Sequence, residues 1–180
     1  MTVNEVRYPV RTTRNVPTAS MASITPLVLL AAQGLATPAC AQDDVFWISP
    51  VSGLWSEASN WSSAPVPGLP GSENRRVNIA LAGTYTVDLD FNATSSGMEL
   101  VNSAATLRFS GPSGALTTTG DNRFTGANIA GSGSNTLTTG GLTVFSGGAT
   151  IAGISAANFG GRTEFTGDDI DLCDTCVFLT

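Results

Sequence analysis

The chain has 180 residues, 14 acidic and 8 basic, and a formal net charge of −6. It contains neither histidine nor lysine, which excludes His-based triads, Cys–His dyads, His-ligated zinc sites, Schiff-base chemistry and a Walker-type phosphate lysine. The acidic balance, with only five scattered arginines after residue 40, is also unlike the basic surface of nucleic-acid-binding proteins, so no nucleic-acid partner is expected.

Residues 1–41 are predicted to be a secretory signal peptide. Arg7, Arg11 and Arg14 give a basic start, residues 27–32 are apolar, and small residues at 39–41 precede a cleavage site. The uncharged stretch is interrupted by proline and glycine and is shorter than the roughly 20 apolar residues of a transmembrane helix. We therefore expect an exported protein, extracellular or at the cell surface (periplasm or outer membrane in a Gram-negative cell), with no stable membrane span after cleavage.

Residues 42–96 are rich in tryptophan and proline and contain the first predicted strands. Polar and apolar residues alternate over 76–81 and again over 85–91, the pattern of strands with one buried face. The short link 82–84 predicts either a hairpin or a tight corner between them. No part of the mature chain shows a helical period over 11 or more residues.

Residues 97–180 are rich in Gly, Ser and Thr and show an approximate repeat of 20–22 residues. Leu116 is echoed by Leu137, and Ile129 by Ile151. A Phe-Ser/Thr-Gly step also recurs, at Phe109, Phe124, Phe145 and Phe165. Such a period of short strand-like runs and glycine turns is typical of a solenoid, in which stacked turns bury a continuous core.

The sequence thus predicts an all-β fold, a right-handed parallel β-helix (β-solenoid) with an N-terminal cap. Its parts are the signal peptide (1–41), the Trp/Pro-rich cap and first strands (42–96) and the solenoid turns (97–180). Two alternatives stay open: low-complexity disorder of the Gly/Ser/Thr-rich part, and a compact β-sandwich over residues 43–110.

Three groups of residues are candidates for a site. Trp55 and Trp61 either form an exposed platform for sugar rings or are buried as a lid over the first turn. Cys173 and Cys176 are expected to form a disulfide in an oxidising compartment. The third group is acidic and consists of Asp168, Asp169, Asp171 and Asp174.

No cofactor is expected, although carboxylates at this density suit a weak calcium site. The Asp168-Asp169 pair is also similar to the paired aspartates of β-helical pectin-cleaving hydrolases, where carboxylates act as acid and base on a glycosidic bond. A solvated acidic turn with no ligand is the ordinary interpretation of the same residues.

The N-terminal part contains the Trp-bearing segment 53–61, followed by Val66-Pro67-Gly68, Val77-Asn78-Ile79 and the strand 85–90. In this order of motifs it resembles the start of bacterial autotransporter-type, hemagglutinin-like surface proteins. The resemblance covers about residues 45–110. The sequence departs from the usual pattern in having Arg75-Arg76 where an acidic residue precedes the second strand, and in stopping without a translocator barrel or anchor.

The resemblance implies a parallel β-helix with a non-catalytic, adhesin-like role towards carbohydrate or another cell-surface or matrix component. The short chain suggests a truncated passenger whose open end can self-associate by strand pairing. The alternatives are a β-helical polysaccharide-degrading enzyme that uses Asp168 and Asp169, and an inactive fragment.

Overall fold

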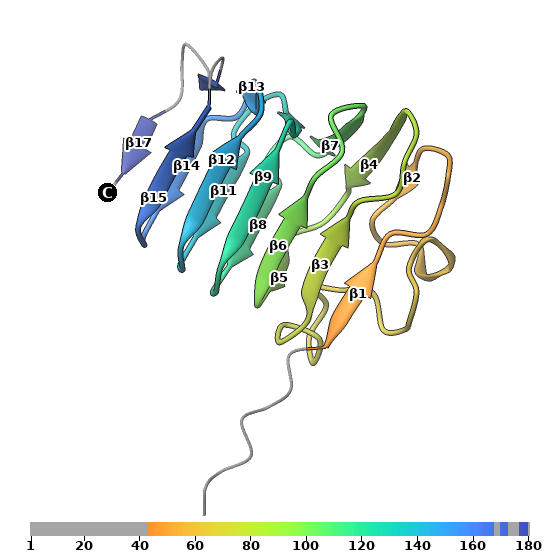
Figure 1. Ribbon diagram of the computed structural model, residues 1–180. Helices are drawn as coiled ribbons and strands as arrows, with labels where there is room; N and C mark the ends of the chain where they lie inside the picture. Colours follow the sequence, from red (N-terminus) through yellow and green to blue (C-terminus); the bar gives the residue numbers. More distant parts are fainter. Residues whose placement is uncertain (1–42, 168–169, 173–176, 180) are drawn as a thin grey trace, which may run out of the picture. The chain divides into compact units, whose positions relative to one another are not determined.

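The computed structural model describes residues 43–167, 170–172 and 177–179. These residues form three parallel β-sheets that wind into a β-solenoid of about five turns (Figure 1). Each strand pairs with its equivalents in the neighbouring turns, so the sheets run the length of the stack. The parallel pairing confirms the predicted solenoid and rules out an antiparallel sandwich over residues 43–110.

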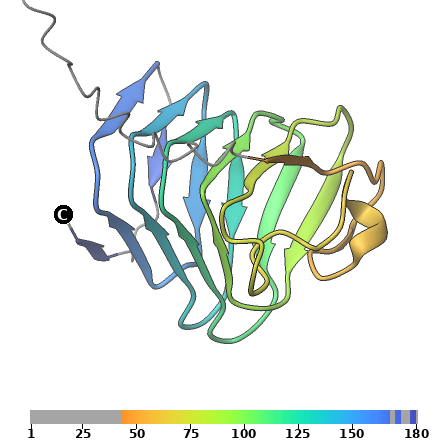
Figure 2. The same cartoon turned by 90° about the horizontal axis from the view of Figure 1, so that it is seen from below.

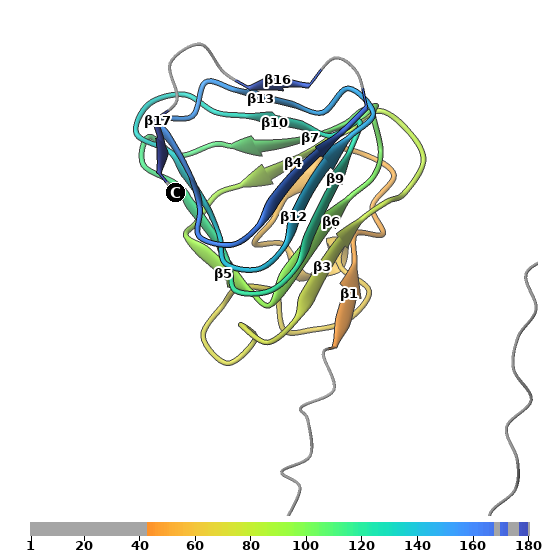
Figure 3. The same ribbon diagram turned by 60° about the vertical axis from the view of Figure 1, so that its left-hand side comes forward.

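We name the sheets faces 1, 2 and 3, and Figure 3 shows them as the sides of a triangle. Face 1 contains β1 (Asp44–Phe46), β3 (Arg76–Ile79), β6 (Gly97–Leu100), β9 (Asn122–Thr125), β12 (Thr143–Ser146) and β15 (Thr163–Thr166). Face 2 contains β2 (Gly53–Leu54), β4 (Tyr85–Leu89), β7 (Ala105–Phe109), β10 (Asn128–Ala130), β13 (Thr150–Ala152) and β16 (Asp171–Leu172). Face 3 contains β5 (Ala93–Ser95), β8 (Ala115–Thr118), β11 (Thr136–Thr139), β14 (Ala156–Phe159) and β17 (Val177–Leu179).

Alternating side chains divide each strand between core and solvent. In β4, the even members Thr86 and Asp88 are partly exposed, whereas the three residues around them are buried. The parallel register places equivalent residues of successive turns above one another, so that Leu107, Ile129 and Ile151 form one inner row of face 2. Burying each such side chain contributes roughly 1.5–3 kcal/mol, and this continuous core holds the turns together.

The Phe-Ser/Thr-Gly repeat has a clear structural cause in three of its four copies. Phe124, Phe145 and Phe165 occupy the same inner position of successive strands in face 1. The glycine that follows each of them turns the corner with positive φ: Gly126 (60°), Gly147 (62°) and Gly167 (99°). Side chains are disfavoured at such φ values, which is why glycine recurs there.

The copy at Phe109 has a different position in the fold. Phe109 belongs to β7 in face 2, where it pairs with Leu89 rather than with a phenylalanine. Gly111, which follows it, does not have a positive φ. The link 82–84 is a corner between faces 1 and 2, since β3 and β4 lie in different sheets.

The predicted N-terminal cap is formed by residues 47–75, drawn in orange and yellow at one end of the stack of turns in Figure 2. Its 3₁₀ helix η1 (Ala58–Asn60) leads into a segment that closes the free edge of β1. Ile48 N donates to Asn60 O (2.8 Å), and Ser62 N donates to Phe46 O (2.9 Å). The first strand of face 1 therefore has hydrogen-bond partners on both sides, which protects the edge against pairing with other chains.

Candidate functional site

The two tryptophans proposed for sugar stacking lie inside the cap. Trp55 is 0% exposed and Trp61 is 3% exposed. Their indole N–H groups donate to Pro67 O and Trp55 O, each at 2.7 Å, and their rings pack edge to face with centroids 4.9 Å apart. An indole whose ring is covered has no free face for a sugar, so the lid interpretation holds and the exposed platform does not form.

Most of the acidic and cysteine candidates lie outside the described residues. This applies to Asp168, Asp169 and Asp174, and to the predicted disulfide between Cys173 and Cys176. Only Asp171 is described, as an exposed residue of β16 in register with Thr150. Calcium binding, catalysis by the aspartate pair and the disulfide remain predictions.

The described residues were also searched for a membrane-spanning helix and for a metal site. The predicted leader 1–41 also lies outside the described residues. Within the residues that are described, no helix is long and apolar enough to span a bilayer. The same residues contain no group of three or more Cys, Asp or Glu side chains placed to hold a metal ion.

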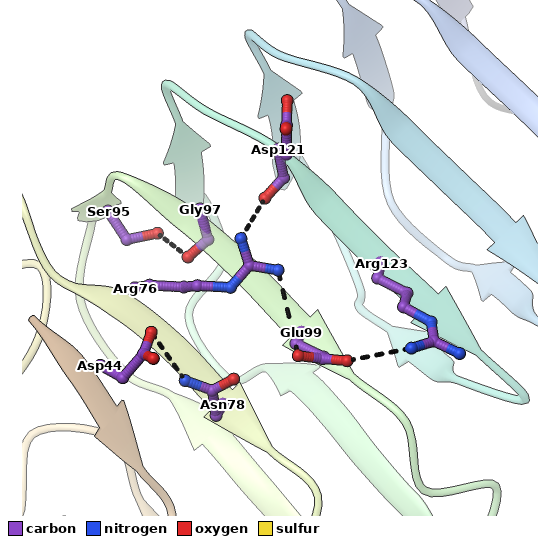
Figure 4. A network of polar contacts seen from close by, with 8 residues as sticks. All are labelled: Asp44, Arg76, Asn78, Ser95, Gly97, Glu99, Asp121 and Arg123. Atoms are coloured by element: carbon purple, nitrogen blue, oxygen red, sulfur yellow. Dashed lines mark hydrogen bonds and ion pairs between the residues drawn. The ribbon is translucent and has the colours of Figure 1, made fainter. Parts of the chain in front are cut away.

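A strip of charged side chains crosses the outer surface of face 1. Glu99 lies between two guanidinium groups, 3.9 Å from Arg76 and 3.4 Å from Arg123, as Figure 4 shows. Arg76 also donates to Asp121 O (3.4 Å). Opposite charges are thus paired across neighbouring turns, and exposed pairs of this kind contribute roughly 0–1 kcal/mol each.

Face 2 has a corresponding pair of opposite charges. Arg108 donates to Asp88 twice, from Nε (2.5 Å) and from Nη2 (2.8 Å). These hydrogen bonds, and then the attraction of the carboxylate charge, raise the pKa of Arg108 above its ordinary value. The pair joins the outer sides of β4 and β7, directly before the corner that leads to face 3.

The candidate site is a hollow of about 270 Å³ at this corner between faces 2 and 3. It lies between the β4–β5 turn and the β7–β8 turn. Its wall is formed by Leu89, Asp90, Phe91, Asn92, Gly111, Pro112, Ser113 and Gly114.

A difference in turn length creates the hollow. Leu89 pairs with Phe109, and Ala93 pairs with Leu116, so the two turns begin and end in register. The first turn takes four residue steps between these ends, whereas the second takes seven. The extra residues of the longer turn project beyond the shorter one and leave a recess against it.

The longer turn is held in place by the next turn of the solenoid. Asn135 is completely buried, and its Oδ1 accepts a hydrogen bond from Gly114 N (2.7 Å) while its Nδ2 donates to Ser132 O (2.7 Å). Pro112 O accepts from Ser134 N (2.9 Å). The rim of the hollow is therefore fixed by backbone contacts before any ligand arrives, which lowers the entropy cost of binding.

Two polar side chains of the hollow are also fixed. Asp90 accepts hydrogen bonds from Ser56 N (3.0 Å) and Ser56 Oγ (2.5 Å), which tie its carboxylate to the cap. Asn92 Oδ1 accepts from Ala115 N (2.9 Å). No residue of the described chain accepts a hydrogen bond from Asn92 Nδ2, so this donor is available to a ligand.

The wall also contains apolar side chains. Leu89 is fully buried beneath it, Phe91 is partly exposed, and Pro112 is exposed. A recess with an apolar side and a few oriented polar groups is the usual form of a small-molecule site. At about 270 Å³ it lies just below the lower end of the range of about 300–1,000 Å³ for drug-sized ligands, which fits one small ring.

Comparison with known proteins identified no matching family model, no matching curated protein and no matching solved structure. The functional interpretation therefore depends on the chemistry of the site. No sequence motif pointed to Asp90, Phe91, Asn92 or Ser113 as ligand contacts. The available signal was the Gly-Pro-Ser-Gly run at 111–114, which interrupts the repeat.

Proposed function

We propose that the chain is an exported, non-catalytic β-solenoid protein that binds carbohydrate in an adhesin-like role. The observation that carries this proposal is the amphipathic hollow at the corner between faces 2 and 3. A sugar ring presents apolar C–H groups on its faces and hydroxyl groups around its edge. The hollow offers matching surfaces. Phe91 and Pro112 can contact the C–H groups, and Asp90 and Asn92 can hydrogen-bond to the hydroxyl groups.

The scaffold supports recognition rather than induced closure. Both polar side chains are held by backbone or cap donors, and the rim is held by the following turn. Stacked turns bury a continuous core, so the hollow has a fixed shape. Groups oriented in this way bind small polar ligands with little loss of conformational freedom.

The order of parts, a tryptophan-bearing cap followed by stacked turns, is what supports a finer assignment. We propose that the chain is related in architecture to autotransporter-type, hemagglutinin-like surface proteins and acts outside the cytoplasm. The parallel stack and the buried tryptophans of the cap are compatible with this assignment. Fractionation of cells that express the full chain tests it, because a product confined to the cytoplasm would contradict export.

Binding is tested on a glycan array with the full chain and two tryptophan variants. Gly111 lines the hollow, its φ is not positive, and a side chain added there meets no atom within 4 Å. Gly111→Trp should therefore fill the hollow without straining the fold. Ala104→Trp is the matched control, since Ala104 is exposed at the corner between faces 1 and 2.

The wild type and Ala104→Trp should bind the same glycans, and Gly111→Trp should lose at least tenfold in affinity. The absence of any glycan bound by the wild type would refute carbohydrate recognition. Equal binding by the two variants would show that the hollow is not the site.

A further inference from the structure

We infer that the hollow selects neutral and amino sugars and rejects acidic ones. This inference rests on the proposed function, because it names the class of sugar that the same site takes. It follows from the charges that the corner presents, from the way they are fixed, and from the donors and acceptors that remain free.

The wall of the hollow has one charged group. Asp90 contributes a carboxylate, and none of the eight lining residues is an arginine. A cation that pairs with their carboxylate favours the binding of uronic or sialic acids, and arginine is the side chain best suited to this. The hollow therefore has a charge that repels the acidic group instead of one that binds it.

The nearest charged pair on the same strands does not supply the missing cation. Arg108 precedes the longer turn, but its Nε and Nη2 atoms are both engaged by the two oxygens of Asp88. Turning the guanidinium towards a ligand would break both bonds and leave Asp88 beside the acidic sugar. The ion pair as a whole has no net charge, so the local charge at the corner remains that of Asp90.

The Asp90 carboxylate is oriented as an acceptor for a ligand. Ser56 supplies one donor to each of its oxygens, which fixes the group and still leaves lone pairs free, because a carboxylate accepts about four hydrogen bonds. A sugar hydroxyl can donate to these lone pairs, and an ammonium group can donate with the added attraction of opposite charge. Asn92 Nδ2 supplies the complementary donor for a ring or hydroxyl oxygen.

Ser56 is accordingly a positioning residue for the site. It belongs to the cap, 34 residues before Asp90, and both of its hydrogen bonds to Asp90 cross from the cap to the corner. The cap thus has a second role beyond closing the end of the solenoid, since it fixes the direction in which the carboxylate accepts.

The charge difference sets the size of the expected selectivity. Two unit charges about 4 Å apart in a water-like medium repel with about 1 kcal/mol, which corresponds to about a fivefold change in affinity. A sugar acid should therefore bind at least fivefold more weakly than the neutral sugar of the same ring. An amino sugar should bind at least as tightly as the neutral one.

The test uses methyl glycosides that differ at one group: the glucoside, glucosaminide and glucuronide, and the corresponding galacto series. Each glycoside is titrated into the full chain at pH 7 and low ionic strength. The dissociation constant is obtained from the changes in NMR chemical shift. The isosteric variant Asp90→Asn keeps an acceptor for Ser56 N and removes the charge. Its folding is checked by circular dichroism against the wild type.

In the wild type the glucuronide or galacturonide should bind at least fivefold more weakly than its neutral partner, and in Asp90→Asn this ratio should approach one. Raising the salt concentration should also narrow the ratio in the wild type, because exposed charges are screened. This second measurement keeps the test valid should the variant fail to fold. Equal or tighter binding of the acidic sugar at low salt would overturn the selectivity, whereas failure of all six glycosides to bind would overturn the proposed function itself.

Discussion

Replacing Phe145 by alanine should remove a large part of the stability of the solenoid. The side chain is 0% exposed and its ring contacts three others: Phe124 (centroids 5.0 Å apart), Phe165 (5.5 Å) and Phe159 (5.6 Å). A buried Phe→Ala change costs about 3–5 kcal/mol through lost transfer energy and the cavity left behind. With three aromatic neighbours we expect the upper half of this range, about 4–5 kcal/mol.

Phe165→Ala is the matched control, because it removes the same side chain from the same row one turn later. Phe165 is 51% exposed, so about half of its apolar surface already contacts water and its removal leaves no closed cavity. We expect a loss of about 1–2 kcal/mol.

The assay is urea unfolding followed by far-UV circular dichroism. With a slope of about 2 kcal/mol per M, Phe145→Ala should lower the midpoint by about 2–2.5 M and Phe165→Ala by about 0.5–1 M. Equal shifts for the two variants, or a loss below about 1 kcal/mol for Phe145→Ala, would refute the argument that the inner phenylalanine row carries the core of face 1.

Two further predictions concern a buried phenol and the glycine corners. Burial raises the pKa of Tyr85 above its ordinary value of 10.0. Because the pKa in the folded state exceeds the pKa in the unfolded state, the contribution of the neutral phenol to the free energy of unfolding should be fully present below pH 10. It should be lost as the pH rises through the pKa of the folded state. Between pH 8 and pH 11 the melting temperature of Tyr85→Phe should fall by less than that of the wild type. Equal falls in the two proteins would contradict the role of the Tyr85 phenol. Gly153→Ala should destabilise the fold by at least 2 kcal/mol more than Gly71→Ala: both glycines have positive φ (68° and 89°), but only at Gly153 does an added Cβ collide with Gly131 O. Similar unfolding midpoints for the two alanine variants would show that close stacking of the corners is unimportant.

The architecture could be predicted because the spacing of identical residues in the sequence equals the length of one solenoid turn. Leu116 and Leu137 are 21 residues apart in the sequence and pair directly between β8 and β11. Ile129 and Ile151 likewise pair between β10 and β13. Parallel stacking places equivalent residues in contact, so self-similarity in the sequence translates directly into register.

The copy of the motif at Phe109 shows that a short motif does not by itself define the register. Phe-Ser-Gly at 109–111 has the same letters as the true repeat, but its glycine is not in the left-handed region and its phenylalanine lies in face 2. A single occurrence of three residues cannot distinguish a corner after face 1 from one after face 2. Only the longer register, in which Phe124 and Phe145 pair, separates them.

The candidate site could not be predicted for a related physical reason. The hollow depends on the difference between two neighbouring turns, and neither turn alone has a sequence motif for a ligand. Asp90 and Asn92 become neighbours of Ser113 only through the stacking of β5 on β8. The tryptophans left two interpretations open, since a large aromatic side chain is equally suited to a sugar platform and to a lid, and composition does not reveal which face is covered.

The central claim is that a sugar occupies the corner between faces 2 and 3, and NMR mapping tests it most directly. The amides of the isotopically labelled full chain are followed while the best ligand from the array, or methyl glucoside, is titrated. The account predicts shift changes concentrated at residues 90–92 and 111–114, with little change in the cap or on the charged strip of face 1. Changes concentrated at the cap or on that strip, with none at the corner, would contradict it.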